Sequence, residues 1–144
     1  MAIRDEIMAI ESELSGVFAG TTFYRQNMPL EHATDEITIE LLDSGLKTET
    51  SFYNRRERSY RICYFGSSDI AVVSAMEKIE SLFMERIKLS ISDGHYIRFV
   101  DFSFTKGFET ETDGIYCSIG LLKTESREAI PQSDYQKIRN VYIE

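Results

Sequence analysis

The segment Tyr53–Phe65, with the sequence YNRRERSYRICYF, places the strongest constraint on the fold of this 144-residue chain. Its second half alternates strictly between two rows of side chains and is rich in aromatic and β-branched residues. This pattern is typical of a half-buried β-strand. The row that we expect to face the core is Tyr60, Ile62 and Tyr64. Strand-like stretches lie on both sides of the segment in the sequence, so we predict that it forms a central strand.

The first half of this segment concentrates positive charge in a chain whose net charge is −8. Its arginines are Arg55, Arg56, Arg58 and Arg61. The basic cluster has three interpretations: it balances acids of the same molecule, it meets an acidic surface of another protein or of a second copy, or it meets nucleic acid. Nucleic acid ranks third, because the remaining surface of an acidic chain repels phosphate. We therefore expect no sequence-specific nucleic-acid partner.

The residues just before the arginines, 43–54, are mostly polar. They form either a floppy loop or the far part of a long hairpin whose strands extend past the core. The threonines, Phe52 and Tyr53 favour β structure locally, so we predict an arm over residues 43–58 that is ordered at its base. Such an arm has little to pack against in an isolated monomer. The candidate protein-interface residues are Phe52, Tyr53, Arg55, Arg56, Arg58 and Arg61.

The rest of the chain supplies two helices and further strands. Apolar residues recur at helical spacing over residues 2–18 and 70–87, which predicts two amphipathic helices. The apolar stripe of the first is Ile3, Ile7, Ile10, Leu14, Val17 and Phe18, and that of the second is Val72 or Val73, Met76, Ile79, Phe83 and Ile87. The other predicted strands cover residues 21–25, 36–42, 89–92, 95–105 and 114–123. The last of these places an apolar row on one face, made of Ile115, Cys117, Ile119 and Leu121. Because the strands are bunched in an α-β-β-β-α-β-β-β order, we predict an α+β fold: a mainly antiparallel sheet with two helices packed on one face.

Local signals refine this scheme. Pro29 ends the first strand, since proline cannot donate to a sheet ladder. Asp93-Gly94 predicts a tight hairpin turn. The apolar row changes phase near Phe99–Val100, which predicts a bulge or a break in that strand. Residues 106–113 read as an acidic turn.

The organisation is that of a single α+β domain over residues 1–124. Residues 125–144 form a C-terminal extension or short helix that could dock on a neighbour. The two cysteines, Cys63 and Cys117, fall inside predicted strands without CxxC spacing. We expect both to be reduced, buried and structural.

The sequence shows little sign of a catalytic, cofactor-binding or metal-binding motif. His32 and His95 lack metal-ligand spacing, and no glycine-rich phosphate motif is present. The acids Glu109, Glu111 and Asp113 lack the regular spacing of a calcium loop and read as a solvated turn. We therefore expect no catalytic residues, no cofactor and no bound metal.

The chain also carries no sign of a membrane partner. No apolar run approaches the roughly 18 residues that a membrane span needs. The N-terminal stretch contains acids early and reads as a helix, not as a signal peptide. We expect a cytoplasmic location.

The order of motifs resembles one known family. A helix precedes FYRQNMPLE, and then come EITIELL, RRERSYRICYF, DIAVVSAMEKIESLF, SISDGHYIRFVDFSF and DGIYCSIGLL. This order is similar to that of the tail-terminator, or tail-completion, proteins of long-tailed bacteriophages and phage-like elements. The resemblance covers roughly residues 2–124 and rests on the type and order of the motifs.

The resemblance implies a structural role without catalysis. Proteins of this family form a ring, typically a hexamer, on the head-proximal end of the tail tube. The ring stops polymerisation of the tube protein and presents a surface to the head–tail connector. The chain would then reside in the virion tail after assembly in the bacterial host cytoplasm, with itself, the tube protein and the connector as partners.

Two alternatives remain open. The chain is another head-completion or minor tail component, or it is a small peptide- or ligand-binding α+β module. The second alternative would use the aromatic face of the sheet, made of Tyr60, Tyr64, Phe99 and Phe102.

Overall fold

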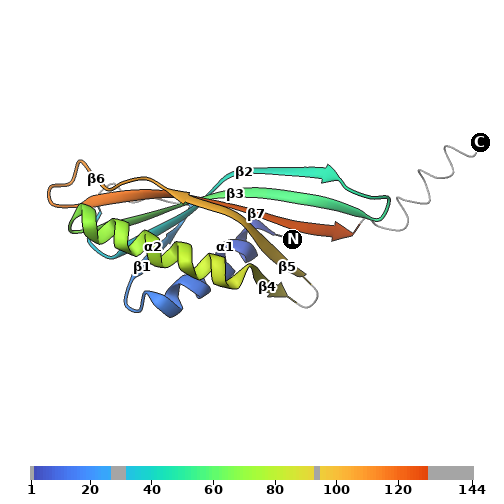
Figure 1. Ribbon diagram of the computed structural model, residues 1–144, viewed down its shortest axis with the longest axis horizontal. Helices are drawn as coiled ribbons and strands as arrows, with labels where there is room; N and C mark the ends of the chain where they lie inside the picture. Colours follow the sequence, from blue (N-terminus) through green and yellow to red (C-terminus); the bar gives the residue numbers. More distant parts are fainter. Residues whose placement is uncertain (1, 27–31, 93–94, 130–144) are drawn as a thin grey trace, which may run out of the picture.

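The computed structural model describes residues 2–26, 32–92 and 95–129. Its elements are α1 (Ile3–Val17), β1 (Thr22–Arg25), β2 (Glu36–Thr48), β3 (Tyr53–Gly66), α2 (Asp69–Arg86), β4 (Lys88–Ser92), β5 (His95–Phe104), β6 (Phe108–Glu109) and β7 (Tyr116–Ala129). Both helices lie on one face of a curled sheet (Figure 1). The predicted α+β class is therefore confirmed. One element was not predicted, the short strand β6 inside the expected acidic turn.

The seven strands form one sheet in the order β1-β2-β3-β7-β5-β4, and β6 pairs with β7. All pairs are antiparallel except β1 with β2. Strand β3 lies between β2 and β7, as predicted for a central strand. The turn signals at Pro29 and Asp93-Gly94 lie outside the described residues. Neither described helix is long and apolar enough to cross a membrane.

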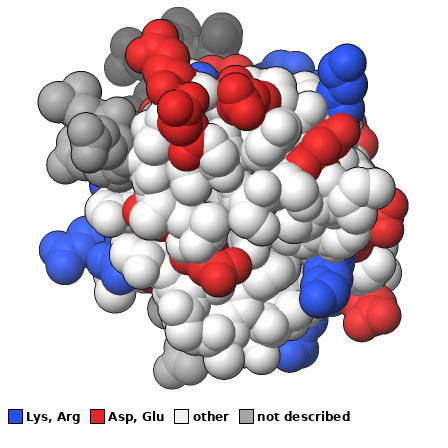
Figure 2. All heavy atoms as spheres, turned by 90° about the vertical axis from the view of Figure 1, so that its left-hand side faces the viewer, with Lys and Arg blue, Asp and Glu red and all other residues white. Residues whose placement is uncertain are grey.

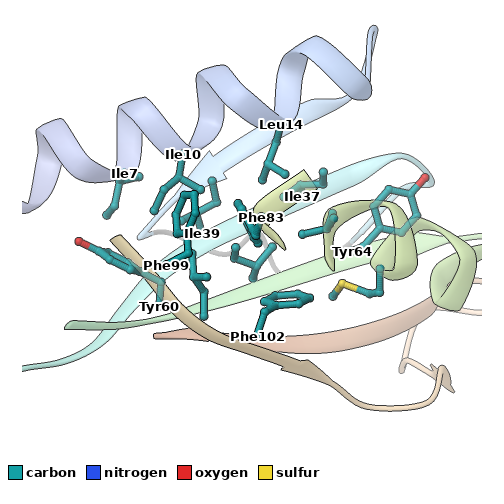
Figure 3. Close-up of a cluster of buried hydrophobic side chains, with 14 of the residues drawn as sticks. Ile7, Ile10, Leu14, Ile37, Ile39, Tyr60, Tyr64, Phe83, Phe99 and Phe102 are labelled. Atoms are coloured by element: carbon teal, nitrogen blue, oxygen red, sulfur yellow. The ribbon is translucent and has the colours of Figure 1, made fainter. Parts of the chain in front are cut away.

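The core lies between the sheet and the two helices (Figure 3). Tyr60, Ile62 and Tyr64 face it from β3, as the alternation predicts. The stripe predicted on the first helix is likewise buried at Ile7, Ile10 and Leu14, and α2 buries Val72, Ala75, Met76, Ile79 and Phe83.

Two residues assigned to these stripes are exposed. Val17 is the last residue of α1 and is 47% exposed, and Ile87 is 55% exposed. Ile87 caps α2 with a φ of 59°, outside the helical region, so its side chain leaves the line of the buried face. The predictions for these two positions are wrong because each lies at the C-terminal end of its helix, past the last buried helical residue, Leu14 or Phe83.

Register shifts in β5 and β2 adjust which side chains face the helices. The predicted one lies at Val100, where the register of β5 with β7 shifts between Phe99 and Asp101. The extra residue allows both Phe99 and Phe102 to be buried. A second shift, which was not predicted, lies in β2 between Leu41 and Asp43. A bulge bends a strand and increases its twist, and this one lies where β2 leaves the core.

A second, smaller cluster lies on the sheet face away from the helices. It contains Cys63, Phe65, Ile115 and Cys117, and the ring of His32 stacks on Phe65 with a centroid distance of 3.8 Å. Both cysteines are free and buried, as predicted. A hydrogen bond to Cys63, together with burial, raises the pKa of the Cys117 thiol.

Gly120 of β7 is a position where the core tolerates no side chain. A Cβ there would lie 2.7 and 2.9 Å from two ring carbons of Phe102 and 3.2 Å from the carbonyl oxygen of Ile62. We expect Gly120→Ala to lower the free energy of unfolding by about 1–3 kcal/mol, because overpacking forces buried groups to shift. Urea unfolding measures this change. Gly45→Ala is the matched control, since nothing lies within 4 Å of a Cβ at Gly45, and equal stability of the two variants would contradict the prediction.

Candidate interaction surface on the hairpin arm

Strands β2, β3 and β7 continue together past the helices as a three-stranded arm (Figure 1). The arm consists of residues 43–48, 53–59 and 123–129. Pairing is continuous to its end, where Tyr53 is opposite Ala129 and Thr48 is opposite Asn54. The predicted hairpin is therefore present and is paired along its whole length. The third strand was missed, because β7 runs well past its predicted end at Lys123.

The tip of the arm displays the two predicted aromatic residues. Phe52 is 51% exposed and Tyr53 is 46% exposed. The hydroxyl oxygen of Thr50 accepts hydrogen bonds from the backbone N–H groups of Phe52 and Tyr53, at 3.2 and 3.0 Å. The carbonyl of Tyr53 accepts from the N–H groups of Glu49 and Thr50. These bonds fix the turn, so the aromatic rings are held on an ordered support.

The side chain of Arg58 is buried in the protein interior and is not exposed on the surface. Its guanidinium pairs with the carboxylate of Glu6 on α1, and its Nε donates to the hydroxyl of Ser44 at 3.1 Å. Both charged side chains are almost fully buried. The hydroxyl of Tyr60 donates to the other oxygen of Glu6 at 2.8 Å. This buried cluster fastens α1 to the base of the arm.

The buried cluster perturbs the acid–base properties of its members. Burial raises the pKa of the Glu6 carboxyl above its usual 4.5, although hydrogen bonds from Tyr60 and the charge of Arg58 oppose that shift. Burial and the nearby Glu6 carboxylate also raise the pKa of Tyr60. Desolvation therefore outweighs pairing at Glu6, as is common when a charge is removed from water.

Arg56 and Arg61 also have partners in the same chain. Arg56 donates through Nε and Nη2 to both carboxylate oxygens of Glu128, at 3.1 and 3.3 Å. This hydrogen bonding lowers the pKa of Glu128. Arg61 donates to both oxygens of Glu40 at 2.9 and 3.0 Å. For these two residues and Arg58, the first interpretation of the basic cluster applies: they balance acids of their own chain.

Arg55 differs from the other three arginines. It is 39% exposed, pairs with Glu57 two positions along the same strand at 3.0 Å, and faces away from Arg56 and Arg58. Across the sheet it lies opposite Lys47 on β2 and Arg127 on β7. Like charges directly opposite one another on adjacent strands are destabilising. Glu57 pairs with both Lys47 and Arg55, and Glu49 pairs with Arg127, so among the described residues this row of three cations has two acid partners in its own chain.

The cation row borders a groove of about 680 Å³ between the arm and the β4–β5 pair. We call it the arm groove. Its lining residues are Glu49, Tyr53, Arg55, Lys88, Tyr96, Arg98, Glu125, Ser126 and Arg127. Arg127 pairs with Glu49 at 2.7 Å, Arg98 pairs with Glu125, and the amine of Lys88 lies 4.8 Å from the centre of the Tyr96 ring.

The sequence prediction found Tyr53 and Arg55 of this groove but missed its other members. Lys88 and Arg98 lie on the consecutive strands β4 and β5, and Arg127 lies on β7. All three are distant in sequence from Arg55, and no motif marks them. The pairing of Arg98 with Glu125 and of Arg55 with Arg127 brings them together. Only the strand register could have identified them.

The aromatic residues of the alternative ligand-binding interpretation are not on a surface. Tyr60, Tyr64, Phe99 and Phe102 are all buried under the helices, and the rings of Phe99 and Phe102 pack against Phe83. That interpretation is wrong for these four residues. Within residues 2–26, 32–92 and 95–129, no group of three or more His, Cys, Asp or Glu side chains is placed to hold a metal ion.

The fold and the arm together define an α+β domain with a projecting, charged, three-stranded arm. No family model matches the chain, and no curated protein matches it in sequence. Among solved structures, one match is 13% identical with a TM-score of 0.59 and covers 91% of this chain and 99% of the other. Another is a chain described as virion of native gene transfer agent (GTA) particle, which is 12% identical with a TM-score of 0.47 and covers 84% and 93%. At 13% identity the first match shows the fold alone, and the second is too distant in structure to add to it.

Proposed function

We propose that the chain is a subunit of a phage tail terminator. In this proposal the subunits form a ring, with six copies by analogy to the family, on the head-proximal end of the tail tube. The ring stops the addition of tube protein and offers a joining surface to the head–tail connector. The complete ring would reside in the virion tail after assembly in the cytoplasm of the bacterial host.

The observation that carries the proposal is the arm. Three strands leave the core, extend past both helices and end in a fixed turn with exposed Phe52 and Tyr53. Exposed strand edges can pair with another chain, and exposed apolar patches mark surfaces that bind a partner. The order of helices and strands also agrees with the order of motifs on which the family resemblance rests.

A ring requires a contact between two different surfaces of the same subunit. The arm projects from one end of an elongated molecule (Figure 1), so it can reach a neighbour without displacing the core. Among the predicted interface residues, Phe52, Tyr53 and Arg55 are the ones that the arm presents outward. We therefore assign these three to assembly contacts, and Arg56, Arg58 and Arg61 to the stability of the subunit.

The test is removal of the gene from the phage or phage-like element that encodes the chain, followed by electron microscopy of the particles. We expect tail tubes of uncontrolled length that carry no heads, and we expect purified protein added to growing tubes to restore a uniform length. Normal particles without the protein would refute the proposal. Heads that leak their contents beside normal tails would indicate a head-completion protein, and absent tails would indicate a minor tail component.

A further inference from the structure

We propose that the arm groove of one copy binds the acidic loop around β6, residues 106–113, of a second copy. This inference rests on the proposed function insofar as it identifies the contact between neighbouring subunits. It names a different pair of surfaces from those that would touch the tube or the connector. The argument depends on charge, on exposed aromatic residues and on the positions of the two surfaces.

The acidic loop carries unused negative charge. Glu109, Glu111 and Asp113 are all exposed, and in the described part of the chain none of them forms an ion pair. Figure 2 looks at the end of the molecule that carries β6 and shows acidic side chains gathered toward the top, the level at which β6 lies in Figure 1. Phe108, beside these acids, is 43% exposed.

The loop is held in a defined shape although it is exposed. Phe108 and Glu109 pair with Cys117 and Tyr116 of β7. The hydroxyl of Thr110 donates to the carbonyl oxygen of Ile115 at 2.9 Å, and the backbone N–H of Thr110 donates to the same oxygen at 2.8 Å. A preorganised loop loses little conformational entropy on binding. The acids and the phenyl ring are therefore presented as a fixed unit.

The arm groove offers the complementary chemistry. Its cations Arg55, Lys88, Arg98 and Arg127 outnumber its acids Glu49 and Glu125. Arginine suits carboxylate partners because its planar guanidinium can donate two parallel hydrogen bonds. The rings of Tyr53 and Tyr96, which are 46% and 50% exposed, can cover the exposed ring of Phe108. Within the part of the chain that the structure describes, the row formed by Lys47, Arg55 and Arg127 has only two acid partners, Glu57 and Glu49, so it can accept a further carboxylate.

The two surfaces lie at opposite ends of the long axis (Figure 1). The acidic loop of a subunit therefore cannot reach the arm groove of the same subunit. A contact between unlike surfaces leaves a free groove at one end and a free loop at the other, so it repeats from copy to copy. Such a head-to-tail contact gives a closed ring when its rotation closes.

Complementary charge reversal tests the inference. The groove variant carries Arg55→Glu, Lys88→Glu and Arg127→Glu, and the loop variant carries Glu109→Lys, Glu111→Lys and Asp113→Lys. We expect each variant alone to self-associate at least about tenfold more weakly than the wild type, because like charges then face each other. An equimolar mixture should recover the wild-type mass, because each reversed surface meets a complementary one. Light scattering coupled to size exclusion measures the mass at low salt, and added salt should weaken the wild-type contact.

A control variant that reverses charge on α2, away from both surfaces, tests whether a change in net charge alone weakens self-association. Glu77→Lys with Glu85→Lys reverses two exposed acids on α2, and this variant should keep the wild-type mass. Circular dichroism confirms that each variant is folded. The inference is overturned if the mixture stays as dissociated as its components, or if the wild-type chain remains monomeric at every concentration at low salt. It is also overturned if a single-stranded oligonucleotide occupies the groove and displaces the second copy.

These outcomes are independent of the test of the proposed function. If the mixture stays dissociated but the protein still controls tube length, the terminator proposal stands and the groove binds another partner. If the mixture recovers the wild-type mass but particles are normal without the gene, the chain self-associates through these surfaces and its role is not tail termination.

Discussion

Arg58→Ala is expected to lower the free energy of unfolding by about 3–5 kcal/mol, because removing one partner of a buried ion pair leaves the other charge unpaired. The group left behind is the carboxylate of Glu6, which is 1% exposed. The hydroxyls of Tyr60 and Ser44 also lose a neighbour. Urea unfolding followed by circular dichroism measures the change.

Arg55→Ala is the matched control for this prediction. It removes an arginine three positions earlier on the same strand, whose partner Glu57 is itself 40% exposed. Exposed ion pairs contribute about 0–1 kcal/mol, so this variant should be nearly as stable as the wild type. The double variant Glu6→Gln with Arg58→Met should recover much of the loss, since it keeps an acceptor for Tyr60 and removes both charges. Equal stability of the two single variants would contradict the structural role of Arg58.

The loss caused by Arg58→Ala should depend on pH. The pKa of Glu6 is raised above 4.5 in the folded state, so the folded chain binds this proton more tightly than the unfolded chain does. The stability that this group contributes is complete below pH 4.5 and is lost as pH rises through the folded pKa. Without Arg58, the ionised form of the Glu6 carboxyl is even less favourable in the folded state than it is in the wild type. The difference between variant and wild type should therefore be larger at about pH 7 than at about pH 4.5.

Phe83→Ala is the second change with a large expected effect, a loss of about 3–5 kcal/mol in the free energy of unfolding. Phe83 is fully buried on α2. Its ring centroid lies 4.7 Å from that of Phe99 and 5.4 Å from that of Phe102, on either side of the bulge in β5. Alanine leaves a cavity between the helix and the bulged strand, which denaturant unfolding can measure.

The neighbouring residue provides the control for Phe83. Met84 is 49% exposed, so Met84→Ala removes a large side chain from the same helix without opening a cavity. We expect a change of less than about 0.5 kcal/mol. If both substitutions lowered the free energy of unfolding equally, the helix would not be anchored through Phe83. Because α2 leads directly into β4, which carries Lys88 of the arm groove, Phe83→Ala should also weaken self-association.

Short-range patterns predicted most of the fold. Alternation identified the buried row Tyr60, Ile62 and Tyr64, and the change of phase identified the bulge at Val100. These patterns succeed because a strand has a period of two and one face is covered by helices. The row Ile115, Cys117, Ile119 and Leu121 shows the limit of the method. It is apolar, but Ile115 and Cys117 belong to the small cluster on the opposite face of the sheet, and the larger core takes Leu122 from β7.

The candidate site was predicted less completely, because it depends on contacts between distant segments. Four arginines in one stretch look equivalent in the sequence, yet alternation sends Arg55 to one face of the arm and Arg56 and Arg58 to the other. The partner of Arg58 is Glu6, which lies 52 positions away on the N-terminal helix. No local sequence pattern predicts such a pairing. Likewise, no local pattern predicts which cations lie with Arg55 around the groove.

The burial of both thiols has a practical consequence for experiments on assembly. Cys63 and Cys117 are the only cysteines in the chain, and they are 2% and 3% exposed. A cysteine introduced at the arm tip or in the β6 loop would therefore be the thiol that a maleimide dye reaches in the folded protein. Native cysteines need not be removed first, so distances between labelled copies can be followed by fluorescence while subunits assemble.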